Sequence, residues 1–343
     1  MMKVMPNGSR SCSLKGQAEY ERGRGGNRLS RVVGFLVVMS LFSIFGVCTA
    51  SQKKPAKVFA PENFVFIRGG EFTMGSPEGE VGNAEAKAFW LQNFGIDYSE
   101  TQHQVKVSDF AMSKYSVTVG EFRRFVEATG YKTDAEKGGN SVVYFGNNTV
   151  GFKNNVNWRD GVRGVRRPGS EDNHPVLHVS WNDAMAYCEW MTKQSGKTYR
   201  LPTEAEREYA CRAGTTTPFN TGENLTTDQA NYDGNYSYSN NPKGVYRENT
   251  VPVNSFAPNA LGLYNMHGNV YEWCRDWFGG RYYDECKAKG VVENPAGPET
   301  GSRRVLRGGS WGRNAENCRS ANRFRCPPGD RSGSFGFRLV FVP

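Results

Sequence analysis

Two apolar, partly alternating segments lie near opposite ends of the globular part of this chain and constrain its fold more than any other feature. The sequence FVFIRGGEFTM occupies Phe64–Met74, and FGFRLVFV occupies Phe335–Val342. Such alternation is typical of strands with one buried face. The two segments could pair and so bring the two ends of this region together. We find no internal repeat and no second hydrophobic pattern that calls for another domain.

Three helices are predicted from capping signals. Each begins with a Ser or Thr followed three residues later by an acidic residue, in the pairs Thr118 with Glu121, Ser180 with Asp183, and Thr203 with Glu206. Glycines provide natural stops at Gly130, Gly196 and Gly214. Between Gly214 and Arg304 the sequence is rich in Asn, Gly, Tyr and Pro, which predicts ordered loops that need aromatic or metal anchors.

The formal charge of +9 is concentrated in the N-terminal segment. Residues 1–50 hold seven Lys or Arg against Glu19 and Glu21, so this segment carries +5 and the rest of the chain carries +4. The remainder also lacks a basic cluster interleaved with aromatic residues. These features argue against a dedicated nucleic-acid-binding protein.

An uncharged run, Val32–Val47, follows Arg28 and Arg31 and resembles the apolar core of an export signal. Two endings are possible. Cys-Thr-Ala before Ser51 suits ordinary cleavage, which would discard Cys48, whereas FGVC is a loose lipobox that would make Cys48 the lipidated first residue. We favour the second, with residues 1–50 as the signal and anchor segment and 51–62 as a polar tether. The protein would then be exported to the outer surface or periplasm and held at a membrane by lipid.

Six cysteines follow Cys48, and none of them forms a CxxC pair. This spacing disfavours zinc-ribbon and thioredoxin-like sites. In an oxidising compartment some of these cysteines could form disulfides, with Cys274 and Cys286 as a candidate local bridge.

Seven motifs in collinear order carry a family resemblance. They lie at Phe66–Gly70, Phe72–Gly75, Pro175–Asp183, Arg200–Gly214, Asn259–Trp277, Arg307–Trp311 and Gly336–Arg338. Together they resemble the formylglycine-generating-enzyme or sulfatase-modifying-factor family over residues 63–343. The resemblance implies an α+β, C-type-lectin-like fold that is rich in loops and has paired terminal strands.

The turn from Asn265 to Glu272 suggests a calcium site. A side-chain amide and a carboxylate bracket a turn whose carbonyls can converge, which is an arrangement that hard cations prefer. The resemblance implies structural calcium held by the side chains of Asn265 and Glu272 and by the carbonyls of Gly268 and Val270. Alternatively, Glu272 caps the turn.

The resemblance also implies a cysteine pair that binds copper and oxygen and oxidises a cysteine of a sulfatase. Counting from Gly309 and Ser310 places Arg313 at the first cysteine position and Cys318 at the second. A guanidinium cannot replace a thiolate ligand of Cu(I). We therefore predict no catalytic residues and no bound copper, with Cys318 buried or bridged to Cys211. The four histidines form no evident metal motif and are expected to be structural.

The segment Trp311–Phe335 differs from its relatives in a patterned way. Relatives carry asparagine at nine positions of this segment. At each of these positions, this chain carries a residue that can arise when the adenines of an Asn codon are mutated. The pattern resembles the variable proteins of diversity-generating retroelements, of the treponeme variable-protein type, which vary side chains on a lectin-like scaffold. The predicted ligand-binding residues are Trp311, Gly312, Arg313, Asn314, Phe324, Arg325, Cys326, Pro327, Arg331, Ser332, Gly333, Ser334 and Phe335.

The sequence therefore favours a non-catalytic, exported display protein that binds a protein or glycan ligand through segment 311–335. One alternative is a formylglycine-generating or related oxidase that acts on a sulfatase cysteine. Two others are a maturation factor that docks on an exported protein and a drifted loop with no ligand.

Overall fold

The computed structural model describes residues 62–342, apart from 84–86, 89–90, 93–97 and 148. The predicted signal segment, Cys48 and all but the last residue of the predicted tether lie outside the described residues. Within the described part of the chain, no helix combines the length and the apolar composition needed to cross a membrane.

The two terminal segments share one antiparallel sheet. Its strands follow the order β1 (Phe64–Ile67), β4 (Phe110–Ser113), β13 (Val340–Phe341) and β7 (Tyr199–Arg200). Ala111 of β4 is opposite Phe66 of β1 on one side and Phe341 of β13 on the other. The ends of the domain are therefore joined in one sheet, with β4 between them.

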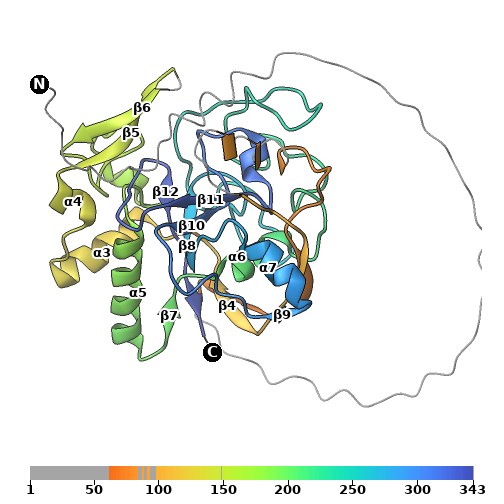
Figure 1. The fold of residues 1–343 in the computed structure, drawn as a ribbon. Coiled ribbons are helices and arrows are strands. Elements are labelled where there is room, and N and C mark those ends of the chain that lie inside the picture. The colour runs from red at the N-terminus through yellow and green to blue at the C-terminus, as the bar shows by residue number, and fades with distance from the viewer. Residues whose placement is uncertain (1–61, 84–86, 89–90, 93–97, 148, 343) are drawn as a thin grey trace, which may run out of the picture.

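A second sheet occupies the centre of the molecule, with α3 and α5 to one side and α6 and α7 to the other (Figure 1). Its order is β11 (Arg323–Cys326), β10 (Arg304–Arg307), β8 (Tyr271–Trp277) and β12 (Phe335–Gly336). A three-stranded sheet contains β2 (Gly70–Met74), β3 (His103–Val107) and β9 (Val292–Glu293), and β5 (Asn140–Gly146) forms a hairpin with β6 (Thr149–Asn154). The fold is the predicted α+β, lectin-like type with several small sheets.

The three predicted helices are α3 (Val119–Thr129), α5 (Trp181–Ser195) and α6 (Glu204–Arg212), and each begins with the predicted capping box. α3 and α5 end at Gly130 and Gly196, which are left-handed with φ of 66° and 70°. α6 ends one residue before the predicted stop, because Ala213 adopts the left-handed cap with φ of 50°. Two further helices, α4 (Asp134–Gly138) and α7 (Tyr282–Lys289), were not predicted from the sequence. The capping box of α4, Thr133 with Glu136, was a usable signal.

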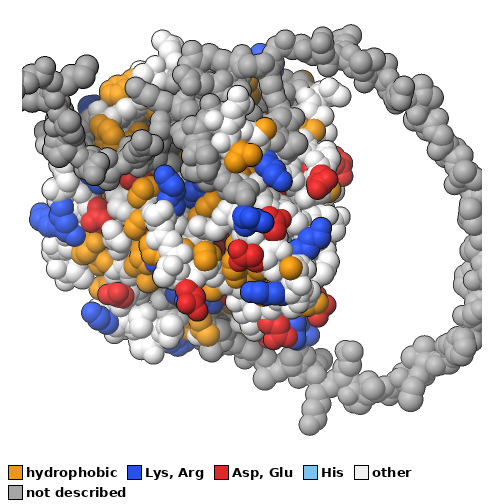
Figure 2. Space-filling model, in the orientation of Figure 1, with side chains coloured by type: hydrophobic (Ala, Val, Ile, Leu, Met, Phe, Trp, Pro, Cys, Tyr) orange, Lys and Arg blue, Asp and Glu red, His pale blue; other side chains and the backbone are white. Residues whose placement is uncertain are grey.

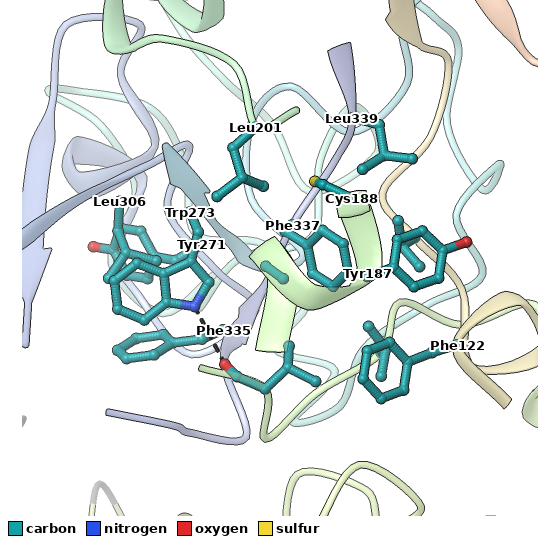
Figure 3. Close-up of a cluster of buried hydrophobic side chains, with 14 of the residues drawn as sticks. Phe122, Tyr187, Cys188, Leu201, Tyr271, Trp273, Leu306, Phe335, Phe337 and Leu339 are labelled. Carbon is teal, nitrogen blue, oxygen red and sulfur yellow. Dashed lines mark hydrogen bonds between the residues drawn. The ribbon is translucent and has the colours of Figure 1, made fainter. Parts of the chain in front are cut away.

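The largest core cluster fills the space between the central sheet and the helices α3 and α5 (Figure 3). Phe122 of α3 stacks on Tyr187 of α5 at a centroid distance of 5.9 Å, and Phe337 contacts Tyr187 at 5.4 Å. The indole N–H of Trp273 donates to the carbonyl of Val179 at 3.2 Å, so this buried ring leaves no polar atom unsatisfied.

The predicted loop region is ordered by aromatic contacts and backbone hydrogen bonds. From Ala213 to Val270 the chain contains no helix or strand, as expected, although β8, α7 and β9 follow it. Phe219 and Tyr238 pack edge to face at 5.0 Å, and the Tyr232 hydroxyl donates to the carbonyl of Leu225 at 2.9 Å. These contacts confirm the expectation of aromatic anchors.

Basic and acidic side chains are interspersed on the face shown in Figure 2 and do not gather into a single basic patch there. Large exposed apolar residues include Phe145 and Phe152 of the β5–β6 hairpin, which are 53% and 56% exposed.

Two glycines of segment 311–335 differ in how much room their surroundings leave. A Cβ at Gly333 would lie 2.9 Å from the carbonyl oxygen of Val162, whereas a Cβ at Gly312 would meet only the Tyr246 hydroxyl at 3.8 Å. We predict that Gly333→Ala lowers the free energy of unfolding by about 1–3 kcal/mol through overpacking. Gly312→Ala should change it by less than about 0.5 kcal/mol. Urea unfolding of both variants measures the difference, and equal effects would show that the backbone contact at Gly333 does not restrict this position.

Candidate functional site

Side chains that belong to the family framework hold segment 311–335 on the rest of the fold. Arg319 is fully buried and donates to both carboxylate oxygens of Glu100, at 2.7 and 3.0 Å. Arg323 of β11 donates in the same two-pronged way to Glu204 of α6, at 2.7 and 2.9 Å. Paired guanidinium–carboxylate contacts fix both distance and orientation. The segment is therefore tied to two separate parts of the scaffold.

The predicted anchor residues of this segment come together in space, but they are not exposed. Phe324 stacks on Tyr271 at 4.9 Å and contacts Phe335 at 6.2 Å, and all three belong to the largest core cluster. Arg325, the next residue of β11, packs over the ring of Phe278 at 4.4 Å and is also buried. The expectation that Phe324, Arg325 and Phe335 project from the surface is not met. Phe324 and Arg325 point to opposite faces of β11, and aromatic side chains cover both faces.

Trp311 belongs to a second aromatic group in the same region. Its ring contacts Tyr144 at 5.2 Å and Tyr246 at 6.3 Å, and its indole N–H donates to the carbonyl of Gly333 at 2.9 Å. Of the predicted contact residues, three are half-buried, namely Gly312, Pro327 and Arg331, and the others are buried. These three residues, with Glu316 and residues 328–330, which are also half-buried, are the accessible positions of the segment and are called its accessible edge.

The two positions of the expected cysteine pair hold a buried arginine and a buried thiol. The backbone N–H of Arg313 donates to the carbonyl of Ser310 at 3.1 Å. The thiol of Cys318 donates to the carbonyl of Asn314 at 3.6 Å. Burial raises the pKa of the Cys318 thiol to about 12, although N–H groups of Ser310 and Gly268 partly oppose this shift. Cys318 is therefore a protonated thiol at neutral pH, and Arg313 supplies no sulfur.

A second thiol, Cys211 of α6, lies in the same neighbourhood. Its Sγ is 3.8 Å from both ring nitrogens of His267 and 3.7 Å from the Ser320 hydroxyl. Charge on Cys211 contributes to the raised pKa of Cys318, so the two thiols lie close enough to interact. The sequence analysis named Cys211 only as a possible disulfide partner. Its position on a predicted helix gave no indication of this histidine contact.

The cysteine pairing differs from both bridges that the sequence suggested. Among the described residues the free thiols are Cys188, Cys211, Cys274, Cys286 and Cys318. Neither Cys274–Cys286 nor Cys211–Cys318 is bonded, so for Cys318 the alternative of a simply buried thiol holds. Cys326, one of the predicted ligand-binding residues, is disulfide-bonded.

Glu272, the predicted acidic calcium ligand, is fully buried and already neutralised by arginines. Its carboxylate accepts from Arg207 at 2.7 Å, from Arg338 at 2.9 and 2.8 Å, and from the Ser116 hydroxyl at 2.7 Å. Burial alone would raise the pKa of Glu272, but Arg338 and Arg207 outweigh it and lower the pKa to about 2. Both oxygens are used, and two cations already face them. The ligands of Glu272 in this structure are therefore guanidiniums and a hydroxyl, and calcium at this residue stays a prediction.

The same two guanidiniums reach the turn that was expected to surround the metal. Arg338 donates to the carbonyl of Tyr264 at 2.9 Å, and Arg207 donates to the carbonyl of Met266 at 2.9 Å. The carbonyls that meet positive charge are therefore those of Tyr264 and Met266, which differ from the predicted calcium ligands Gly268 and Val270. Arg207 lies in a helix where five of nine residues are charged. That density of charge was the signal that α6 is built around ion pairs.

The remaining predicted calcium ligands are also engaged or incomplete. The Gly268 carbonyl accepts from the N–H of Val270 at 2.9 Å, and the Asn265 amide nitrogen donates to the carbonyl of Val253 at 2.7 Å. The Asn265 Oδ1 atom is buried and lacks a hydrogen-bond partner among the described residues, so it is the one feature that fits a cation. A single free side-chain oxygen does not form the cage that calcium requires.

The histidines are satisfied by hydrogen bonds, as expected for structural residues. His178 bonds through Nδ1 to the Ser141 hydroxyl at 2.9 Å and through Nε2 to the carbonyl of Gly161 at 3.0 Å. Burial lowers the pKa of His178 to about 4, so its ring is neutral at physiological pH. His174 bonds to the Thr250 hydroxyl at 3.0 Å. Within the described ranges, no three His, Cys, Asp or Glu side chains are grouped to hold a metal.

The fold and these motifs define a lectin-like protein of the formylglycine-generating-enzyme type. A family model described as "Sulfatase-modifying factor enzyme 1-like domain" matches residues 49–342, and the chain belongs to this family.

Both relatives and solved structures support this assignment. The formylglycine-generating enzyme of Streptomyces coelicolor is 38% identical over 299 residues, which cover 80% of this chain and 88% of that enzyme. The inactive Cα-formylglycine-generating enzyme 2 of Mus musculus is 32% identical over 305 residues, covering 80% of this chain and 84% of that protein. Among solved structures, PvdO from Pseudomonas aeruginosa is 31% identical with a TM-score of 0.61, covering 85% of this chain and all of PvdO. Variable protein 1 of Treponema denticola is 21% identical with a TM-score of 0.55, covering 82% of this chain and 95% of that protein, and this likeness concerns the fold alone.

The buried ion pairs around Glu272 generate a stability prediction. Arg207→Gln leaves Glu272 with only one guanidinium in a fully buried site, and we expect the free energy of unfolding to fall by about 3 kcal/mol or more. The matched control is Arg123→Gln, which removes the surface pair with Asp172, where both side chains are more than a third exposed. That change should be worth less than about 1 kcal/mol. Urea unfolding of the two variants makes the comparison.

A second experiment measures the melting temperature of the wild-type protein with added calcium and with a calcium chelator. Because guanidiniums occupy the cation position, calcium and a calcium chelator should leave its melting temperature unchanged. A chelator-induced drop of several degrees would restore calcium as a structural element of this turn.

Proposed function

We propose that this chain is a non-catalytic member of the family that binds a protein or glycan ligand through the accessible edge of segment 311–335. One observation carries this proposal. Arg313 stands at the position where the resemblance expects the first copper-binding cysteine, and Cys318 at the second position is a buried, protonated thiol. An arginine and a protonated thiol at these two positions do not provide the pair of thiolates that would hold Cu(I) there. The loss of copper chemistry here is consistent with the existence of a relative that is named as inactive.

The segment contains both buried residues that hold it in place and half-buried residues at its edge, and this arrangement supports a role in ligand recognition. Buried framework residues, Arg319 and Arg323, make two-pronged ion pairs with the scaffold. Gly312 before them in the sequence, and Pro327 and Arg331 after them, remain half-buried at the accessible edge. Rigid support beneath a partly open edge is what a recognition surface needs. Because Phe324 and Phe335 pack inside the core, their role in this proposal is to support the edge from below.

We further propose that the segment is diversified, as in the retroelement variable proteins, and that the mature protein is exported and lipid-anchored at Cys48. The substitution pattern at the asparagine positions supports the first point, and the basic, apolar N-terminal sequence supports the second. We expect a near-copy of the DNA that encodes residues 311–335, and a reverse-transcriptase gene, beside this gene. Sequencing of the neighbourhood tests this directly, and the absence of both would remove diversification from the proposal. Mass spectrometry of the mature N-terminus tests the anchor.

A family oxidase is the second candidate, and the enzymes among the named relatives favour it. The structural observation on its side is Cys211, which lies beside His267 and close enough to Cys318 to affect its pKa. In this alternative, Cys211 would replace residue 313 as the partner of Cys318.

One assay separates the two candidates. The purified full chain is loaded with Cu(I) and incubated in air with a peptide that carries a sulfatase-type cysteine, and the peptide is then weighed. We expect no oxidation of the peptide thiol by the wild type or by Cys211→Ser. The assay would favour the oxidase if the wild type converts the cysteine to an aldehyde and if both Cys211→Ser and Cys318→Ser abolish that conversion. Cys188→Ser, which alters a buried thiol of α5 away from this region, is the matched control.

A further inference from the structure

A cavity of about 480 Å³ lies between the loop at 161–168 and the loop at 247–249, outside segment 311–335. Four arginines line it, namely Arg163, Arg166, Arg167 and Arg247. Two carboxylates, Glu171 and Glu248, line it as well, so the lining carries a net charge of +2. A concentration of guanidiniums in one concave site is unusual in a domain whose charge is otherwise close to balanced.

The arginines at the mouth of the cavity are partly paired and accessible. Arg163 forms an ion pair with Glu248 and stands over the ring of Tyr144 at 5.5 Å. Arg166 is 3.5 Å from Asp160. The side chains of Arg163 and Arg166 are 48% and 58% exposed, so a ligand can reach the cavity from solvent.

Arg167 lies deeper and has hydrogen-bonding capacity to spare. Its side chain is only 3% exposed, and it donates through Nε to the carbonyl of Asp160 at 3.2 Å and through Nη2 to the Thr250 hydroxyl at 3.4 Å. Its Nη1 is 3.4 Å from the Glu171 carboxylate but makes no hydrogen bond within the described residues. Burial lowers the pKa of Arg167 to about 10, so it is still charged at neutral pH.

Arg247 repeats this situation on the opposite loop. Its guanidinium packs over Phe256 at 5.5 Å, and its Nη1 is buried without a hydrogen-bond acceptor in the described part of the chain. Buried donors that lack an acceptor carry a desolvation cost, which an anionic ligand would relieve. The two arginines that carry these donors, Arg167 and Arg247, both line the cavity.

We propose that this cavity binds a sulfate or phosphate group. A tetrahedral dianion matches the net charge of the lining, and guanidiniums recognise its oxygens through paired N–H donors. Arg167 and Arg247 supply the unsatisfied donors, and Arg163 and Arg166 supply positive charge at the mouth. None of the residues of segment 311–335 lines the cavity, so the proposal does not depend on the recognition function.

The proposal is tested by titration calorimetry of the full chain in chloride buffer at constant ionic strength. Separate arms use inorganic sulfate, inorganic phosphate and glucose 6-phosphate. We expect saturable binding at one site in at least one arm. A free oxyanion as the ligand predicts tighter binding of the inorganic ions, and a monoester ligand predicts tighter binding of the sugar phosphate.

Two substitutions locate the site. Arg247→Gln, at a half-buried position, and Arg167→Gln, at a buried one, should each weaken binding by about tenfold or more, since each removes a charge-assisted contact. The control is Arg124→Gln on α3, an exposed arginine outside the cavity, which should bind like the wild type. Circular dichroism of Arg247→Gln checks that the fold is retained. The proposal fails if no arm shows saturable binding, or if a folded Arg247→Gln variant binds as tightly as Arg124→Gln.

Discussion

Buried ion pairs centred on helix α6 hold this protein together. Glu208 and Glu204 of α6 pair with Arg307 of β10 and Arg323 of β11, and Arg207 on the same helix pairs with Glu272 of β8. One short helix therefore binds three adjacent strands of the central sheet. Removing one member of an ion pair would leave an uncompensated charge in the interior. The stability of α6 and of these three strands is therefore interdependent. The loop-rich architecture depends on these contacts because its sheets are small and its strands short.

This network also explains the turn at 264–270, where the family resemblance suggested calcium. A calcium ion would join a carboxylate to backbone carbonyls, and here Arg207 and Arg338 make the same connection through their several N–H donors. A guanidinium can make the connections that a calcium ion would make, because it carries a fixed positive charge and presents N–H donors in several directions. The conformation of the turn is therefore stabilised by arginine side chains of the protein itself. The side-chain Oδ1 of Asn265, another predicted ligand, has no hydrogen-bond partner among the described residues.

Local signals in the sequence predicted local structure well. The capping boxes at Thr118, Ser180 and Thr203 gave three helix starts, because a cap is a contact between residues three apart. Burial was harder to predict, since the inward direction of Phe324 and Phe335 depends on Tyr271, which lies far away in the sequence. The ion-pair partners of Glu272 were missed for the same reason. A carboxylate in a carbonyl-rich turn suggests either a metal or an arginine, and only the three-dimensional packing distinguishes them.

A catalytic copper site and a ligand-recognition surface place different requirements on residue 313 and its surroundings. The copper site that the resemblance implies would need thiolates at both residue 313 and residue 318. A recognition edge has the opposite requirement, because its backbone must stay fixed while its side chains change. The pairing of Arg319 with Glu100 and of Arg323 with Glu204 meets that requirement, since both contacts use framework residues and leave residues 312 and 313 free of structural ion pairs within the described chain. Arg313 takes no part in the ion pairs that join the central sheet to α6, so these contacts do not depend on the side chain at residue 313.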